Sequence, residues 1–249
     1  MMKLVLDFGN TLKKFALFEA NRLIRLESAD DIPDIELEAF TRDYLRENAQ
    51  KPVRSAILSS VVDYPDSFRE YLQKNYQLVL IDEKTSLPIR NSYKSKSSLG
   101  RDRLAIAVAS HSLFPGNNVL AINAGTCLTY DFVSSSGEYL GGAISPGMNM
   151  RFRALNNLTA HLPLMDGSSF EGLIGRTTAE SIISGVMNGI AAEVDGIINR
   201  YRENYENLTV ILSGGDLNRF DKKLKNSIFA SPYLVLTGLN IILDFNEKK

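Results

Sequence analysis

Short apolar runs separated by turn residues open the chain and predict antiparallel strands. Three such runs lie between residues 4 and 26, with Gly9-Asn10 and Ala20-Asn21 between them. Runs of this length bounded by Gly or Asn are typical of strands joined by tight turns. Residues 34–49 then place apolar side chains three to four positions apart, which predicts a helix.

The next segment reads as buried strands alternating with helices. Residues 56–62 and 78–81 are apolar without alternation, as expected for strands covered on both faces, and a helix is predicted between them. Residues 91–101 are too polar for a core. An apolar helix over 104–111 follows and ends before Pro115-Gly116.

The same plan then begins again. A strand over 118–122, a Gly-Thr loop, a strand over 128–133, a turn and a strand over 139–144 repeat the order at the start of the chain. We therefore predict an α/β fold of two similar domains, 1–114 and 115–249. Each is expected to be a mixed sheet flanked by helices, with a cleft between the matching loops.

A long helix and a last glycine loop complete the second domain. The helix over 178–202 carries an apolar stripe, which is typical of a core helix. The stripe consists of Ile182, Val186, Ile190, Val194, Ile197 and Tyr201. A strand over 208–212 leads into Ser213-Gly214-Gly215-Asp216, and such strand ends commonly meet a nucleotide.

Composition narrows the class of protein. The 249 residues hold 28 Lys and Arg against 29 Asp and Glu, so no basic excess points to a nucleic acid. The first apolar run stops at Asp7, too early for a signal peptide, and no stretch predicts a membrane span. The single cysteine, Cys127, excludes an intramolecular disulfide. We expect a cytoplasmic protein with no nucleic-acid or membrane partner.

The first turn has the residues of a phosphate-binding loop. In the run from Asp7 to Thr11, Gly9 lets backbone N–H groups approach phosphate oxygens, and Asn10 and Thr11 add donors. Lys13 and Lys14 can offset phosphate charge, and the Asp7 carboxylate can hold Mg²⁺. An ordinary hairpin turn remains the alternative, because Gly-Asn is common there.

The second loop, Asn123-Ala124-Gly125-Thr126, lies at the matching place in the repeat. A lone Gly-Thr means little, but its recurrence favours a phosphate chain contacted by both loops. Cys127 beside it is interpreted as a small buried side chain rather than a nucleophile.

Gly100-Arg101-Asp102-Arg103 forms a third candidate cluster. Asp102 could accept a hydroxyl proton while Arg103 binds an anionic group through two hydrogen bonds. From spacing alone, a solvated ion-pair cluster at a helix start is the simpler interpretation. Neither His111 nor His161 lies in a motif, and we assign them no catalytic role.

Taken in order, the motifs resemble those of the type III pantothenate kinases, within the actin-like ATPase and sugar-kinase superfamily. The family pattern is Asp-x-Gly-Asn-Thr, Gly-x-Asp-Arg, Asp-x-Gly-Thr-x-x-Thr-x-Asp, Gly-Gly-x-Ile-x-Pro-Gly, Asn-Thr-x-x-Ala/Ser-Ile-x-x-Gly and a late Gly-Gly. The chain matches this pattern at residues 7–11, 100–103, 123–131, 141–147, 177–185 and 214–215.

The resemblance implies two actin-like ATPase (ribonuclease H-like) domains. It also implies transfer of the ATP γ-phosphate to the hydroxyl of pantothenate, the first step of coenzyme A biosynthesis. Asp102 matches the family's proton acceptor. ATP contacts are implied for Asp7, Phe8, Gly9, Asn10, Thr11, Leu12, Lys13, Lys14 and Thr126. Pantothenate contacts are implied for Tyr93, Gly100, Arg101, Asp102, Arg103 and Thr178, with Arg103 as a partner for the carboxylate.

Two positions depart from the family pattern. The family has an aspartate at the position of Asn123, and that carboxylate binds a monovalent cation such as K⁺ or NH₄⁺. The Asn123 amide brings no negative charge, so we expect a weaker cation site. Thr177 replaces an asparagine and keeps a hydrogen-bonding side chain. Mg²⁺ is expected with ATP, at Asp7.

The resemblance further implies a homodimer whose interface completes the pantothenate site, with helix 178–202 as a candidate partner face. Two alternatives stay open. Asn123 would also suit a non-catalytic nucleotide-binding regulator of the same fold. Another kinase or phosphohydrolase of the superfamily is the second, although such chains are generally longer.

Overall fold

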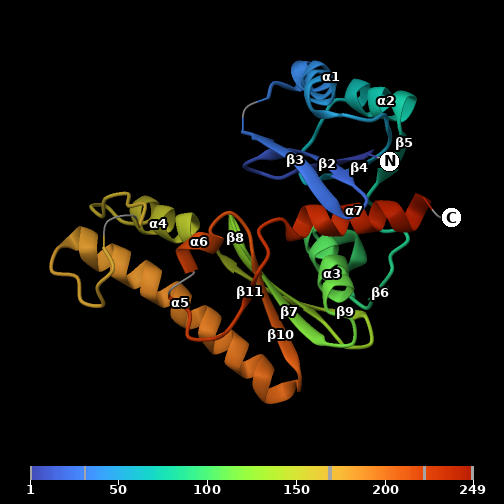
Figure 1. Cartoon of the computed structure of the whole chain (residues 1–249). Helices are drawn as coiled ribbons and strands as arrows, with labels where there is room; N and C mark the ends of the chain where they lie inside the picture. The colour runs from blue at the N-terminus through green and yellow to red at the C-terminus, as the bar shows by residue number, and fades with distance from the viewer. Residues whose placement is uncertain (1, 31, 168–169, 221–222, 248–249) are drawn as a thin grey trace. The chain divides into compact units, whose positions relative to one another are not determined.

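The computed structural model describes residues 2–30, 32–167, 170–220 and 223–247, which form two compact units. Unit 1 comprises Met1–Leu113 and Tyr233–Lys249, and unit 2 comprises Phe114–Pro232 (Figure 1). The first break falls beside the boundary predicted at residue 115. The segment from Tyr233 onward, however, belongs to unit 1, whereas the sequence assigned it to the second domain.

Unit 1 contains a five-stranded sheet with helices on both faces. Its strands are β1 (Met2–Phe8), β2 (Lys13–Glu19), β3 (Arg22–Ala29), β4 (Val53–Ser60) and β5 (Gln77–Leu80), and the short β6 (Arg90–Asn91) follows. Its α-helices are α1 (Leu37–Asn48), α2 (Asp66–Asn75), α3 (Arg101–Leu113) and α7 (Leu234–Glu247), with 3₁₀ turns η1 (Asp34–Glu36) and η2 (Lys96–Ser98).

Unit 2 repeats this plan with one much longer helix. Its strands are β7 (Asn118–Ala124), β8 (Cys127–Val133), β9 (Glu138–Pro146), β10 (Leu208–Ser213) and β11 (Phe229–Ala230). Its helices are α4 (Met148–Asn157), α5 (Thr178–Asn204) and α6 (Leu217–Phe220).

The two sheets have the same strand order and direction, which confirms the predicted repeat. Unit 1 runs β3-β2-β1-β4-β5, and the corresponding strands of unit 2 run β9-β8-β7-β10-β11. In each case the first three strands of the unit pair antiparallel, and the two later strands join parallel to the first. The chain therefore builds one supersecondary design twice.

Alternation along β1 assigns each of its side chains to one face of the sheet. Leu4, Leu6 and Phe8 belong to the core that contains residues of α1 and α2. The intervening Lys3 and Asp7 lie on the opposite face, where Lys3 Nζ contacts Asp244 of α7 at 2.6 Å. Figure 1 shows α1 and α2 on one side of this sheet and α7 on the other. Asp7 therefore lies on the face of the sheet that α7 covers.

The last helix belongs to unit 1 because its small and apolar residues fit α3. A Cβ at Gly238 would lie 1.9 Å from the carbonyl oxygen of Ala105, so the two helix backbones touch at this glycine. Leu239, Ile242 and Leu243 of α7 are fully buried. This packing supports α3, which carries the candidate residues Asp102 and Arg103 in its first turn.

In unit 2, α5 is the central core helix. Of its predicted stripe, Ile182, Val186, Ile190 and Val194 are buried, and the remaining two residues pack at the margin of the same cluster. Thr177 caps the helix, because its hydroxyl accepts the Glu180 N–H while the Glu180 carboxylate accepts the Thr177 N–H. By length and composition α5 could span a membrane, but half of its most apolar window is buried, as in a core helix.

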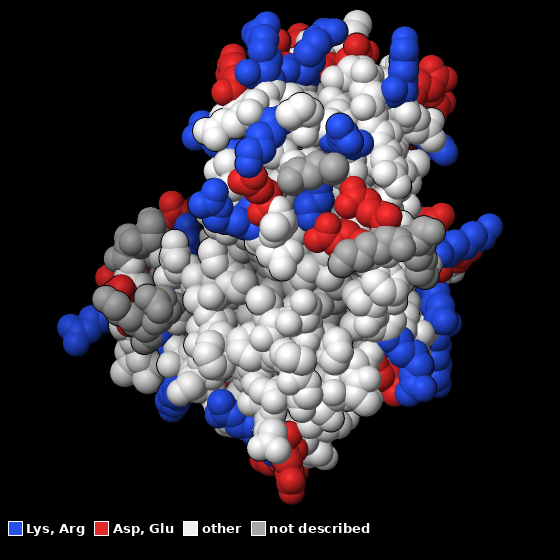
Figure 2. Space-filling model, turned by 45° about the vertical axis from the view of Figure 1, so that its right-hand side comes forward, with Lys and Arg blue, Asp and Glu red and all other residues white. Residues whose placement is uncertain are grey.

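Charged side chains are unevenly spread over the visible face of the molecule. Figure 2 shows areas where Lys and Arg are interspersed with Asp and Glu, and a broad area with few charges. Apolar side chains of β9 and α4 are exposed on unit 2, among them Leu140, Ile144 and Met150. Such surface is available for contact with another protein chain.

Candidate functional site

The candidate site of unit 1 begins at the carboxyl end of β1. Asp7 lies opposite Lys14 of β2 and beside Ser59 of β4 in the strand register. Paired residues in neighbouring strands share a face, so these three polar side chains gather at one point. Lys14 Nζ lies 3.8 Å from Asp7 Oδ2. A carboxylate and an ammonium, two of the candidate groups of this loop, therefore lie side by side.

Asp7 holds its proton unusually strongly. The pKa of its carboxyl is raised from 3.8 to about 6, chiefly because the group is buried. The nearby positive charge of Lys14 lowers the pKa in part, and the negative charge of Asp102 raises it again. The two carboxylates therefore interact electrostatically.

Asp102 lies in the first turn of α3 and folds back on that turn. Its Oδ1 accepts a hydrogen bond from the Arg103 N–H at 2.9 Å, one of the helix N–H groups without an intrahelical partner. A Cβ at Gly100 would lie 2.6 Å from the same oxygen. Glycine at position 100 therefore leaves room for the Asp102 carboxylate in the conformation that accepts the Arg103 N–H.

Arg103 and Tyr93 also come together, as the resemblance implied for a shared ligand. The guanidinium carbon of Arg103 lies 5.7 Å from the centre of the Tyr93 ring, within cation–π range. Arg103 is only 5% exposed. The planar fork of N–H groups on a guanidinium is suited to bind a carboxylate through two parallel hydrogen bonds.

The loop after β1 differs from the expected phosphate cradle in two details. The Gly9 N–H already donates to the Leu12 carbonyl at 3.0 Å, so contacts to phosphate must come from other groups of the loop. Lys13 lies on the opposite face of β2 from Lys14. Its Nζ donates to the Ile32 carbonyl at 2.9 Å and lies 3.5 Å from Asp34 Oδ1. Lys13 is therefore not brought together with Asp7.

Three glycine loops of unit 2 meet at one edge of its sheet. A Cβ at Gly147 would lie 2.2 Å from the Gly125 carbonyl oxygen and 2.4 Å from that of Thr126. A Cβ at Gly214, whose φ is +99°, would lie 2.1 Å from the Ala124 carbonyl oxygen. Gly125 itself faces open space. The loop that carries Thr126 is thus backed by glycines and open on its other side, as a nucleotide contact requires.

Asn123, the candidate cation ligand, lies near the end of β7 between two hydroxyl residues of the neighbouring strands. It pairs with Thr129 of β8 and with Ser213 of β10. The buried Asp131 lies farther along β8 and accepts hydrogen bonds from Thr129 and Tyr139. The side-chain oxygens of Asn123, Thr129 and Ser213 are ligand atoms of the type that K⁺ binds. In the part of the chain that the structure describes, no three His, Cys, Asp or Glu side chains gather into a metal site.

Sequence reasoning missed a polar network behind the second loop. Arg151 donates to the Pro146 carbonyl and the Ser145 hydroxyl and pairs with Glu193 of α5, which also accepts from Tyr130. Burial opposes the charge on Glu193, but the hydrogen bonds hold its pKa below the usual range. The one sequence feature that could have pointed to this network is Arg151, four residues after the Pro-Gly turn.

Cys127, which was interpreted as a small buried side chain, is half-buried. Its Sγ lies 3.9 Å from Met150 Sδ.

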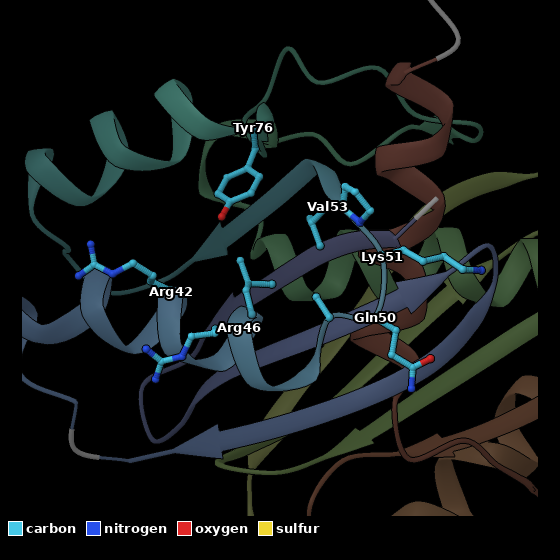
Figure 3. A pocket seen from close by; sticks show the side chains of 9 residues that line it. Arg42, Arg46, Gln50, Lys51, Val53 and Tyr76 are labelled. Carbon is cyan, nitrogen blue, oxygen red and sulfur yellow. The ribbon is translucent and has the colours of Figure 1, made fainter.

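A separate hollow at the end of α1 is lined by cations but is not a second site (Figure 3). Arg42 lies 3.6 Å from Glu38, Arg46 lies 3.2 Å from Asp43, and Lys51 pairs with Glu19. Because each cation already has an acidic neighbour, the hollow offers little net charge to an anion.

Comparison with known proteins places the chain in one family. The profile described as "Type III pantothenate kinase" matches residues 3–200. A relative from Christiangramia forsetii with the same description is 43% identical over 252 residues, which cover 99% of each chain. One from Phocaeicola vulgatus is 39% identical, covering 99% of this chain and all of its own.

Solved structures support the fold. The activator of the 2-hydroxyisocaproyl-CoA dehydratase from Clostridium difficile, with bound ADPNP, aligns with a TM-score of 0.59 at 13% identity. The alignment covers 100% of this chain and 96% of that one. The α/β architecture of two similar domains, predicted from the repeat, and its actin-like fold, implied by the resemblance, are thereby confirmed.

Proposed function

Because this chain belongs to the type III pantothenate kinase family, we propose that its Asp102 activates the pantothenate hydroxyl for attack on ATP. The enzyme phosphorylates pantothenate in coenzyme A biosynthesis. The hydroxyl oxygen forms a bond to the γ-phosphorus while the bond to the bridging oxygen of ADP breaks. The hydroxyl proton passes to the Asp102 carboxylate.

The position of the first turn of α3 carries this proposal. Arg101, next to Asp102, donates to the carbonyl of Ser60, which pairs with Phe8 of β1, so the proposed proton acceptor lies near the β1 loop proposed to bind the phosphates. Proton transfer and phosphate binding must occur at the same place, because the attacking oxygen bonds to the γ-phosphorus. Two carboxylates on separate surfaces would not meet this condition.

Asn10, Thr11 and Lys14 are the proposed phosphate contacts of unit 1, and Thr126 is the proposed contact of unit 2. Lys14 supplies positive charge beside Asp7, whereas the ammonium of Lys13 is directed to Ile32 and Asp34. Phosphoryl transfer depends mainly on alignment and on neutralising the phosphate oxygens.

Mg²⁺ is proposed to bind Asp7 together with ATP. Mg²⁺ is commonly held by one or two carboxylates and the substrate phosphates, without a protein cage. The single buried carboxylate of Asp7, with its raised pKa, fits such a shared site, because a cation would relieve its buried charge. The ion would neutralise charge on the phosphates.

Asn123 is proposed as a weak ligand for K⁺ or NH₄⁺. Its amide oxygen can coordinate such an ion, and Thr129 and Ser213 lie beside it in the sheet. The amide carries no charge, so the proposed site binds a cation less strongly than a carboxylate site.

Arg103 is proposed to bind the pantothenate carboxylate, with Tyr93 against the guanidinium. The burial of Arg103 and its contact with the Tyr93 ring support this role. Thr178, exposed at the start of α5, is proposed as a further pantothenate contact supplied by a second copy of the chain. We propose a homodimer and a cytoplasmic location.

Asp102→Asn tests the proposal directly. The amide cannot accept the hydroxyl proton, so kcat should fall by ~10²–10⁴-fold. Formation of phosphopantothenate from ATP is measured with Mg²⁺ in K⁺, NH₄⁺ and Na⁺ buffers. Full kcat in the variant would refute the acceptor, and equal rates in all three buffers would refute the cation site. A wild type inactive in every buffer would instead favour the non-catalytic regulator.

A further inference from the structure

Arg101, the first residue of α3, joins two strand ends of unit 1. Its Nε donates to the Ile81 carbonyl at 2.6 Å, and its Nη1 donates to the Ser60 carbonyl at 2.9 Å. Ser60 is the last residue of β4, and Ile81 directly follows β5. The guanidinium thus spans the carboxyl ends of two parallel neighbours. Its rigid fork of N–H groups suits two acceptors at once.

The hydrogen bonds of Arg101 fix the place where α3 begins. The preceding segment is polar, and η2 contains no buried residue. Leu104 is the first apolar side chain of α3 that is buried. Between these, Arg101 and Asp102 are not buried. The two hydrogen bonds of Arg101 connect this turn to the sheet that also carries Asp7.

We infer that Arg101 is a positioning residue for Asp102 and does not itself bind pantothenate. Nε and Nη1 both donate to backbone carbonyls, so the Nε edge of the guanidinium is occupied and its observed partners belong to the sheet. Asp102 follows it directly in the same helical turn, and a shift of that turn moves the carboxylate relative to Asp7. This inference rests on the proposed role of Asp102.

Arg101→Met and Arg101→Lys are the informative variants. Methionine keeps an apolar stem but donates no hydrogen bond, whereas lysine retains the charge and can serve one carbonyl at a time. We expect kcat of Arg101→Met to fall about 10- to 100-fold, because misplacement by about 1 Å has effects of that order. KM for pantothenate should change less than about threefold. Lysine should recover part of kcat. Arg69→Met, at an exposed position of α2, is the matched control and should retain kcat.

A neutral substrate separates positioning from binding. An amide analogue of pantothenate lacks the carboxylate charge, so a residue that binds that carboxylate should matter less with the analogue. For Arg101→Met we expect the same loss of kcat/KM with both substrates, and for Arg103→Met a smaller loss with the amide. A loss confined to KM, or one that disappears with the amide, would overturn the inference.

Hydrogen exchange provides a readout that does not depend on activity. Faster exchange of backbone amides 101–104 is expected in Arg101→Met, and Arg101→Lys should be intermediate. Unchanged exchange together with unchanged kcat would refute the positioning role whatever Asp102→Asn shows. If Asp102→Asn kept full activity while Arg101→Met exchanged faster, the acceptor assignment would fail and the hydrogen-bonded attachment of α3 would stand.

Discussion

At the scale of single residues, Asp7 keeps a carboxyl group where burial disfavours its charge. The pKa of this group is raised from 3.8 to about 6. Between these two pH values the folded chain binds more protons than the unfolded chain, so the free energy of unfolding falls as pH rises. The loss is complete above the folded pKa and amounts to roughly 3 kcal/mol for a shift of this size. Asp7 thus carries a stability penalty at neutral pH that its proposed contact with Mg²⁺ and ATP would relieve.

Asp7→Asn should therefore stabilise the protein without ligands while abolishing its activity. We expect the variant to exceed the wild type in free energy of unfolding by roughly 1–3 kcal/mol at pH 7.5 and by much less at pH 4, because pH 4 lies close to the unfolded pKa and the loss of stability has only begun there. Urea unfolding at both pH values measures this difference.

Asp82→Asn is the control with the opposite sign. Hydrogen bonds from Thr85 and Lys84 lower the pKa of this exposed carboxyl, so its removal should not stabilise the protein at pH 7.5. If Asp7→Asn were no more stable than the wild type at pH 7.5, the buried charge of Asp7 would not be what lowers the free energy of unfolding of the wild type.

The residue scale also shows how far the candidate site could be predicted. The alternation of side chains along β2 predicts that Lys13 and Lys14 face opposite sides of the sheet. Only the strand register shows that Lys14 is the one that pairs with Asp7. Gly100 was identifiable from its motif, but its closeness to Asp102 Oδ1 appears only in the structure. The partners of Arg101 had no signature, because backbone carbonyls are acceptors that every sequence contains.

At the scale of elements, the contact between α3 and α7 supports the first turn that carries Asp102. Gly238 leaves no room for a larger residue, since its Cβ would lie 1.9 Å from the Ala105 carbonyl oxygen. Gly238→Ala should force the helices apart and lower the free energy of unfolding by about 1–3 kcal/mol, with a larger loss for Gly238→Val. Thermal unfolding and kcat are measured together.

The stability to heat and kcat should both decline in the order glycine, alanine, valine at position 238, because a shift of α3 also moves its first turn, which carries Asp102. The volume-conserving Ile241→Leu on the same helix is the control and should change either quantity little. A stable Gly238→Val enzyme with normal kcat would show that α7 does not set the position of α3.

The strands and most helices were predictable because their signals are local. Apolar runs bounded by Gly and Asn marked β1 to β3, and a stripe with helical spacing marked α5. The α7 helix was not predicted. Its apolar residues show that it is buried but do not say against which sheet, and chain order alone assigned it to the wrong domain. Long-range packing, such as the contact of Gly238 with Ala105, assigns α7 to unit 1.

At the scale of the whole molecule, α5 buries one face and leaves another composed of small residues. Ser181, Gly185, Gly189, Ala192 and Gly196 are all exposed, three to four positions apart on the helix. A Cβ at any of these three glycines would meet no atom within 4 Å. Small residues at this spacing let a second helix approach closely. The exposed Leu173 and Ile174, just before α5, add apolar area beside this face.

Gly189→Arg therefore tests the proposed dimer. A large charged side chain at the centre of the small-residue face should prevent close approach, and sedimentation should then shift from twice the chain mass to the single chain of 27.7 kDa. Because Thr178 of a second copy is a proposed pantothenate contact, the monomer should also lose most of its kcat/KM. Gln73→Arg adds the same charge to an exposed position of α2 and should change neither the mass measured by sedimentation nor kcat/KM. A dimeric Gly189→Arg enzyme would exclude this face of α5 as the interface, and a fully active monomer would show that each chain completes its own pantothenate site.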